Sequence, residues 1–293
     1  MSKTINLGVI GISPGNGHPY SWSAIFNGYN KDKVHLCSFP VIPEYLSKRR
    51  FPENQIPGAV VSHVWTQSLE ESSKIAQFAN IEHVCENMED LFECDAILLA
   101  RDDASEHARM AIPFLKAGIP VFVDKPLALS ILDANKMFDA CKEPWQLFTC
   151  STLRYAEEFN IKNQTFSEIQ FFEATTAGYW KTYGVHIVEA FMRFAPHRGK
   201  LVSIQKEILD DSHIVLVKWE NVGARFTCTG KQPSSIFVGY NKAGVNEKHV
   251  FADSFSSFKS ALKEFLEEVV LKNRIPIPKA ETLEIIEIIE KGL

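Results

Sequence analysis

Several residue patterns that mark common protein classes are missing from this chain. Its cysteines contain no C-x-x-C pair, which argues against a zinc knuckle and a disulfide framework, so we expect them to be reduced and structural. Its nine histidines contain no H-x-x-x-H cluster, and we predict no catalytic metal. The six cysteines are Cys37, Cys85, Cys94, Cys141, Cys150 and Cys228.

Long hydrophobic runs and a basic stripe are missing as well. The apolar run near the N-terminus ends at Gly11 and is too short for a signal-peptide core or a membrane span, which predicts a cytoplasmic protein with no membrane partner. The net charge is -5 with Lys and Arg scattered, so we expect no nucleic-acid partner. What is present is 45% hydrophobic content over 293 residues, which is enough for two cores.

The first half of the chain alternates strand-like runs with helix-like segments, as is typical of a parallel sheet covered on both faces. We therefore predict the α/β class, with a Rossmann domain over residues 1–150. Strands are expected near residues 7–12, 34–39, 59–65, 96–100, 120–124 and 146–151. Helices, where apolar residues recur three and four positions apart, are expected at 21–29, 69–80, 105–117 and 131–141.

After about residue 155, longer alternating strands predict an α+β domain over residues 151–293, built on a mainly antiparallel, open-faced sheet. An uncovered apolar sheet face usually finds a partner, so we expect a homodimer or homotetramer. Glu220-Asn221-Val222-Gly223 favours a hairpin turn. The expected strands are 167–176, 201–209, 213–220, 224–229 and 235–240, and the expected helices are 184–194, 256–272 and 279–291.

A glycine-rich turn follows the first expected strand, which is the setting that a dinucleotide pyrophosphate needs. Counted from Gly11, the second and third positions of a G-x-G-x-x-G fingerprint hold Ser13 and Asn16, so the pattern is imperfect. We expect Gly11, Ser13, Gly15 and Asn16 to bind the cofactor. The alternative is that the glycines only turn the chain from strand to helix.

Two neighbouring segments leave their roles open. His18-Pro19-Tyr20-Ser21-Trp22 either lines a ligand cleft or packs the start of the next helix. A second strand at residues 34–39 would carry no acid before Glu44, whereas Rossmann domains use such an acid on the adenosine ribose. The basic residues at 48–50 form either a clamp for a 2′-phosphate or a solvated surface, so the choice between NAD and NADP stays open.

Motifs in both halves carry a resemblance to a known family. The chain reads D-A-I-L-L-A from Asp95, A-G-I-P-V from Ala117 and D-K-P at Asp124-Lys125-Pro126. Later it reads L-R-Y around Arg154 and G-Y-W-K-T-Y-G-V-H-I-V-E from Gly178. This order resembles the Gfo/Idh/MocA oxidoreductases, in which the D-K-P segment is E-K-P and the last segment is G-x-x-x-D-x-G-x-H-x-x-D.

The resemblance implies a function and a set of site residues. It implies an NAD- or NADP-dependent dehydrogenase or reductase that moves a hydride between nicotinamide and a CH–OH or carbonyl carbon of a sugar, sugar acid or nucleotide-linked sugar. By resemblance Lys125 and His186 are catalytic and bind substrate, with Tyr183 in the place of the motif aspartate. Asp124, Lys125 and Pro126 would contact the cofactor, and Arg154 the substrate.

Each assignment has an alternative. Lys125 could simply pair with a carboxylate, His186 could be a buried structural histidine, and Arg154 could form a structural salt bridge. Because a phenol is neutral at pH 7, Tyr183 either joins the proton relay or marks reduced catalysis. The alternative function is a non-catalytic dinucleotide-binding sensor or regulatory protein of the same fold.

Overall fold

The computed structural model describes residues 4–159, 169–242 and 245–293, and these residues form two compact units. The first unit contains Met1–Leu127, Asn135–Thr149 and Ala261–Pro278. The second contains Ala128–Ala134, Cys150–Ser260 and Lys279–Leu293. The division is therefore more interleaved than a single boundary at residue 150, because helices α5 and α7 each begin in the second unit and end in the first.

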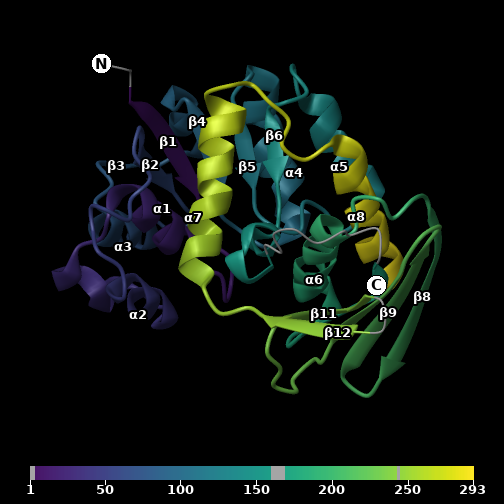
Figure 1. Cartoon of the computed structure of the whole chain (residues 1–293). Helices are drawn as coiled ribbons and strands as arrows, with labels where there is room; N and C mark the ends of the chain where they lie inside the picture. Colours follow the sequence, from purple (N-terminus) through teal and green to yellow (C-terminus); the bar gives the residue numbers. More distant parts are fainter. Residues whose placement is uncertain (1–3, 160–168, 243–244) are drawn as a thin grey trace. The chain divides into compact units, whose positions relative to one another are not determined.

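The first unit is built on a six-stranded, all-parallel sheet in the order β3-β2-β1-β4-β5-β6 (Figure 1). This confirms the predicted Rossmann-type sheet, in which the strand order reverses between β1 and β4. Strands β4 and β5 are buried throughout, as is expected of parallel strands covered on both faces. The strands are β1 (Ile5–Ile10), β2 (Ala59–Trp65), β3 (His83–Val84), β4 (Ala96–Leu99), β5 (Val121–Val123) and β6 (Leu147–Thr149).

Local sequence explains where the main helices of this unit begin and end. The Ser68 side chain accepts a hydrogen bond from the N–H of Glu71 at 3.3 Å and so caps α3, which ends at Asn80 in the left-handed conformation. Gly118, with φ of 96°, ends α4 in the left-handed conformation. The helices are α1 (His18–Asn27), α2 (Val41–Ser47), α3 (Leu69–Ala79), α4 (Ala104–Ala117), α5 (Ile131–Ala140) and a π-helical segment (Phe265–Val270) that continues α7.

The strand predicted at residues 34–39 is wrong. This stretch belongs to a 3₁₀ helix, Lys31–Leu36, which is followed by helix α2. The side-chain oxygen of Asn30 accepts the N–H of Asp32 at 3.0 Å and starts the helical turn, which local hydrogen bonding favours over a strand. The second strand in chain order is therefore Ala59–Trp65, and the position at which Rossmann domains carry a ribose-binding acid lies after Trp65.

The second unit contains a six-stranded mixed sheet in the order β12-β11-β7-β10-β9-β8. Four of its strand pairs are antiparallel, but β7 and β10 are parallel, so the sheet is mainly rather than wholly antiparallel. Residues 167 and 168 of the first predicted strand lie outside the described residues. The strands are β7 (Ile169–Thr176), β8 (Leu201–Leu209), β9 (Ser212–Trp219), β10 (Gly223–Cys228), β11 (Phe237–Lys242) and β12 (Val245–Val250).

Helices α6 (Trp180–Phe194) and α8 (Lys279–Gly292) pack on one face of this sheet. The Trp180 indole N–H donates to the carbonyl of Ile289 at 3.0 Å, and Gly292 lies so close that a Cβ there would be 2.4 Å from Nε1 of Trp180. The third helix is α7 (Ser254–Glu264). The predicted hairpin between β9 and β10 is confirmed, since Trp219 N–H donates to Val222 O at 2.9 Å.

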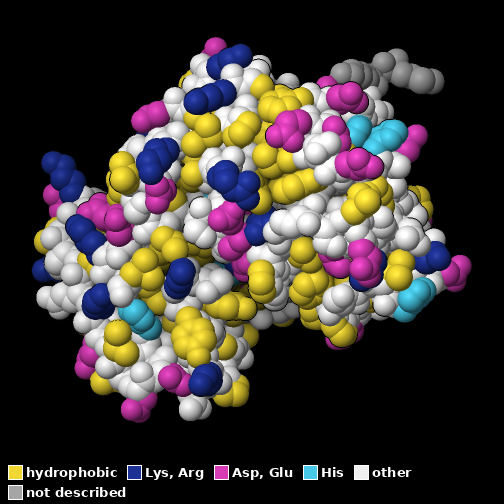
Figure 2. All heavy atoms as spheres, turned by 180° about the vertical axis from the view of Figure 1, so that it is seen from behind, with side chains coloured by type: hydrophobic (Ala, Val, Ile, Leu, Met, Phe, Trp, Pro, Cys, Tyr) yellow, Lys and Arg dark blue, Asp and Glu magenta, His cyan; other side chains and the backbone are white. Residues whose placement is uncertain are grey.

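The surface carries mixed charge. On the face shown in Figure 2, Lys and Arg side chains are interspersed with Asp and Glu side chains rather than gathered into one patch. Within the described ranges, no helix is both long and apolar enough to cross a membrane. The six cysteines all lie in the described part of the chain, and none of them forms a disulfide there.

Candidate active site

The glycine loop joins β1 to α1 at the carboxyl end of the parallel sheet. Asn16 N–H donates to Ser13 O at 3.1 Å, and Gly15 has a φ of +83°, where no atom of the described residues would lie within 4 Å of an added Cβ. Pro14 and Gly15 therefore occupy the two central positions of a turn that needs a positive φ at the second of them. The turn explains this glycine, and it leaves open space around the tip of the loop.

The first glycine of the loop has a different role. A Cβ on Gly11 would lie 2.2 Å from Cγ of Pro19, so the missing side chain lets α1 begin directly against the end of β1. The loop is tied to the neighbouring strand as well. Gly11 N–H donates to Trp65 O at 3.1 Å, and the Gln67 amide bonds both the N–H and the carbonyl of Ile12 at 3.0 Å.

Asp124, the first residue of the D-K-P motif, is 2% exposed at the end of β5 and is surrounded by donors. Its Oδ2 accepts from Asn16 Nδ2 at 3.0 Å and pairs with His18 Nδ1 at 2.5 Å, while its Oδ1 accepts the N–H of Lys125 at 2.8 Å. Burial alone would raise the pKa of this carboxyl, but the attraction of His18 and Lys125 outweighs it and lowers the pKa to about 2. Asp124 is therefore a buried carboxylate that fastens the motif to the glycine loop.

Lys125 is 6% exposed, and its ammonium lies 3.6 Å from Oδ2 of Asp102. Asp102 in turn accepts a hydrogen bond from the Ser13 hydroxyl at 2.6 Å. The structure thus brings together three of the predicted residues, Ser13, Asn16 and Lys125, through two carboxylates. The sequence motifs did not single out Asp102, although its position three residues after the end of β4, at the ligand-binding edge, was a usable signal.

The aromatic segment after the loop packs the start of α1 and supports this cluster. His18 stacks on Trp22 at 5.2 Å between ring centroids, and Trp22 stacks on Phe122 of β5 at 4.8 Å. Trp22 is fully buried, whereas the side chain of His18 keeps 19% exposure. His107 is also fully buried, with its two ring nitrogens 3.0 Å from Leu127 O and 2.9 Å from Arg101 O.

The end of β2 carries no acid. The chain continues from Trp65 as Thr66, Gln67 and Ser68, and the basic residues at 48–50 belong to the end of α2 and the segment after it instead. Lys48 pairs with Glu44 at 2.9 Å, and both side chains are about two-thirds exposed. That pair is a solvated surface contact. Neither the missing acid after β2 nor the basic residues at 48–50 therefore decide between NAD and NADP.

In the second unit, Tyr183 and His186 lie on the first two turns of α6. Their ring centroids are 5.7 Å apart, and Tyr183 is 42% exposed. The Ser151 hydroxyl lies 2.7 Å from Nδ1 of His186 and also accepts the N–H of Leu153 at 3.2 Å. His186 is half-buried, and the contact with Ser151 orients its ring through Nδ1.

Arg154 is held by carboxylates of its own unit. Its Nε lies 2.5 Å from Glu189 and its Nη1 lies 2.7 Å from Glu281. Glu189 is 4% exposed; burial raises its pKa, and the pairing with Arg154 opposes that rise without cancelling it. The salt-bridge role that the sequence left open for Arg154 is present in the structure, whereas substrate binding by Arg154 stays a prediction.

The loop fits the diphosphate of a dinucleotide. It lies between β1 and β4, where the strand order reverses, and the ten-residue helix α1 begins there, so its N-terminal dipole favours an anion. The open space at Gly15 admits a phosphate close to the backbone. No group of three or more His, Cys, Asp or Glu side chains suited to a metal is found among the described residues.

Comparisons with known proteins agree with this geometry. Residues 45–150 match the model of the Gfo/Idh/MocA family, described as an oxidoreductase family with an NAD-binding Rossmann fold, which confirms the resemblance seen in the motifs. No curated protein matches the chain in sequence.

Solved structures share the fold over nearly the whole chain. A probable dehydrogenase from Thermotoga maritima is 13% identical with a TM-score of 0.73, covering 97% of this chain and 94% of its own. A myo-inositol 2-dehydrogenase from Lactobacillus plantarum is 12% identical with a TM-score of 0.72, covering 98% and 96%. GenD2 from gentamicin A biosynthesis, in complex with NAD, is 14% identical with a TM-score of 0.71, covering 99% and 93%.

Proposed function

We propose that this chain, whose residues 45–150 match the model of the Gfo/Idh/MocA oxidoreductase family, is an NAD(P)-dependent dehydrogenase or reductase acting on CH–OH groups. The substrate class that we propose is a sugar, sugar acid or nucleotide-linked sugar, in keeping with similarity to an inositol dehydrogenase. The observation that carries the proposal is Lys125, a buried ammonium held at the carboxyl edge of the sheet next to the glycine loop.

The binding part of the proposal assigns the cofactor to the glycine loop. Gly11, Ser13, Gly15 and Asn16 would hold the diphosphate through backbone N–H groups and the N-terminus of α1. Asp124 and Pro126 would fix the backbone on either side of Lys125, because Asp124 accepts the Lys125 N–H and Pro126 restricts the residue before it. When bound, the nicotinamide supplies the hydride chemistry.

The residues of the chain would then transfer one proton and stabilise the negative charge that develops on the substrate oxygen. The Lys125 ammonium would stabilise the negative charge on the substrate oxygen, or exchange a proton with it. His186, oriented by Ser151, offers a second group that can donate or accept a proton. Tyr183 adds a hydroxyl that can donate and accept hydrogen bonds beside His186.

Replacing Lys125 tests the proposal. Lys125→Met keeps the length of the stem but removes the charge, and we expect turnover to fall by about 10²-fold or more while dinucleotide affinity stays within about threefold. Lys116→Met, on an exposed position of α4, is the matched control and should behave like the unchanged protein. Full activity of Lys125→Met would contradict the proposal.

A second candidate, the non-catalytic dinucleotide-binding sensor, is favoured by one observation. Tyr183 stands where the motif has an aspartate, and Gly178 is packed against its ring. A sensor would bind the dinucleotide but transfer no hydride to any sugar of a broad panel. Turnover at enzymatic rates would exclude this reading.

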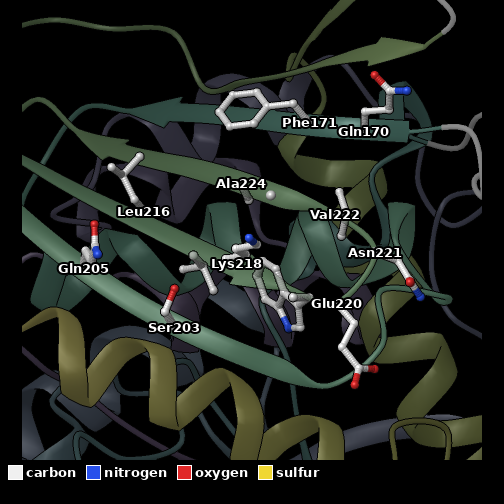
Figure 3. A pocket seen from close by; sticks show the side chains of 13 residues that line it. Gln170, Phe171, Ser203, Gln205, Leu216, Lys218, Glu220, Asn221, Val222 and Ala224 are labelled. Atoms are coloured by element: carbon white, nitrogen blue, oxygen red, sulfur yellow. The ribbon is translucent and has the colours of Figure 1, made fainter.

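We further propose that the chain forms a homodimer or homotetramer through the sheet of its second unit. The face opposite α6 and α8 is open and holds a hollow of about 500 Å³ lined by side chains of β7, β8, β9 and β10 (Figure 3). Phe171 and Leu216 are 43% and 40% exposed there, and Lys218 stands beside them. Light scattering after size exclusion tests this: a monomeric mass would contradict it, and Leu216→Glu should lower the mass of an oligomer.

A further inference from the structure

Asp102 is an acidic residue at the ligand-binding edge that the motifs did not single out. It follows strand β4, its side chain is 19% exposed, and its Oδ2 lies 3.6 Å from the ammonium of Lys125, itself 7% exposed. At that separation the two opposite charges attract each other, and the low exposure of both side chains limits screening of the pair by water.

Asp102 is also held in place by the glycine loop. The Ser13 hydroxyl donates to Oδ1 of Asp102 at 2.6 Å and accepts the backbone N–H of Asp102 at 3.2 Å. This reciprocal pair fixes both the carboxylate and the main chain of the residue. The second oxygen is thereby aimed at Lys125, so the loop determines where the counter-charge of Lys125 stands.

The second carboxylate near Lys125 has a different duty. Asp124 accepts the Lys125 backbone N–H with one oxygen, and its other oxygen is paired with Asn16 and His18. Arg101, next to Asp102, is paired with Asp103. Charged side chains near Lys125 in this unit include Asp102 after β4 and Asp124 after β5, and His18 of α1 pairs with Asp124.

We propose that Asp102 is the positioning residue of Lys125 and supplies its counter-charge from within the Rossmann unit. The inference rests on the proposed function of Lys125 and deepens it. Asp102 holds the ammonium in one direction, and Ser13 couples that ion pair to the loop that would hold the dinucleotide. Asp102 itself need not touch the substrate.

The first test needs no activity. In protein labelled with ¹⁵N-lysine, the Nζ resonance of Lys125 is assigned by its disappearance in Lys125→Met, and its titration is followed against pH without cofactor. In Asp102→Asn, the resonance should titrate at lower pH by about one unit or more, because an opposite charge has been removed. Asp103→Asn, the same substitution one residue later, should leave the titration in place.

The second test uses turnover. Asp102→Asn should lower kcat by about tenfold at neutral pH and move the limb of the pH profile that Lys125 produces to lower pH by the same amount as the resonance. The substrate KM should change little. Asp102→Glu, which restores the charge, should bring the pH limb back to its original position. If Asp102 had only a structural role, restoring its charge would not move that limb.

The outcomes separate this inference from the function it rests on. An unchanged Nζ titration in Asp102→Asn overturns the positioning role, whether or not the protein turns over a sugar. A shifted titration in a protein without any turnover keeps the ion pair and contradicts the dehydrogenase. If Asp102→Asn does not fold, Ser13→Ala replaces it: a smaller shift in the same direction is expected, and no shift overturns the proposal.

Discussion

Nδ1 of His18 lies 2.5 Å from the buried carboxylate of Asp124, two residues that are 106 positions apart in the sequence. His18 is the first residue of α1 and Asp124 follows the end of β5, so their contact joins α1 to β5 at the carboxyl edge of the sheet, next to Lys125. The contact keeps Asp124 ionised in an environment that would otherwise favour its protonated form.

The ionisation of Asp124 predicts a pH dependence of stability. Its pKa falls from an ordinary value of 3.8 to about 2 on folding, which corresponds to about 2 kcal/mol. Because the folded pKa is the lower one, this stabilisation is fully present above about pH 4 and is lost as the pH falls towards 2. Urea unfolding should show Asp124→Asn less stable than the unchanged protein at pH 7, with a smaller difference at pH 3; an equal difference at both pH values would contradict the account.

Gly178 should tolerate alanine less well than Gly15 does. Both have strongly positive φ, +85° and +83°, but a Cβ at Gly178 would lie 2.4 Å from the Tyr183 ring, whereas a Cβ at Gly15 would meet no described atom within 4 Å. Backbone strain of about 1 kcal/mol is expected in each alanine variant, with an additional loss in Gly178→Ala from displacement of Tyr183. Urea midpoints compare the two directly, and equal losses would show that Tyr183 moves freely.

Arg154 should matter for stability. Arg154→Met leaves Glu189, which is almost fully buried, without its partner, and breaking a buried ion pair in this way costs about 3–5 kcal/mol. The double variant Arg154→Met with Glu189→Leu should recover part of that loss, because the buried carboxylate of Glu189 is then removed as well. Calorimetric unfolding measures both, and a single variant as stable as the unchanged protein would show that the pair is not structural.

The thiols should differ sharply in reactivity. Burial raises the pKa of Cys94 and Cys228 to about 12, so almost no thiolate forms there at pH 8. Cys141 is the one cysteine of the six that is not buried. A thiol-reactive chromophore should therefore label Cys141 first in the native protein and all six only after unfolding; fast labelling of Cys228 would indicate local opening.

Much of the fold was predictable, and the misses have physical causes. Hydrophobic runs placed β1, β2, β4 and β5 correctly because buried parallel strands carry a strong local signal. The stretch at residues 34–39 misled because its apolar residues also suit a 3₁₀ turn, which the Asn30 side chain then selects. The parallel pairing of β7 with β10 depends on a long connection that no local pattern encodes.

The site was predictable as far as its motifs, but not in its contacts. D-K-P placed Lys125 at the end of β5, where it is found. The pairs Ser13–Asp102 and Asn16–Asp124 join residues 89 and 108 positions apart, and only the folded sheet brings their loops together. The two non-glycine positions of the fingerprint thus have a structural explanation. Ser13 and Asn16 both donate to carboxylates at neighbouring strand ends.

The central claim is that the glycine loop binds a nicotinamide dinucleotide next to Lys125. Calorimetric titration of the purified protein with NAD, NADH, NADP and NADPH tests it most directly, followed by absorbance at the reduced-nicotinamide band with a panel of sugars and sugar nucleotides. The account predicts binding of at least one dinucleotide and turnover with one of these substrates. Absence of binding by all four would contradict it.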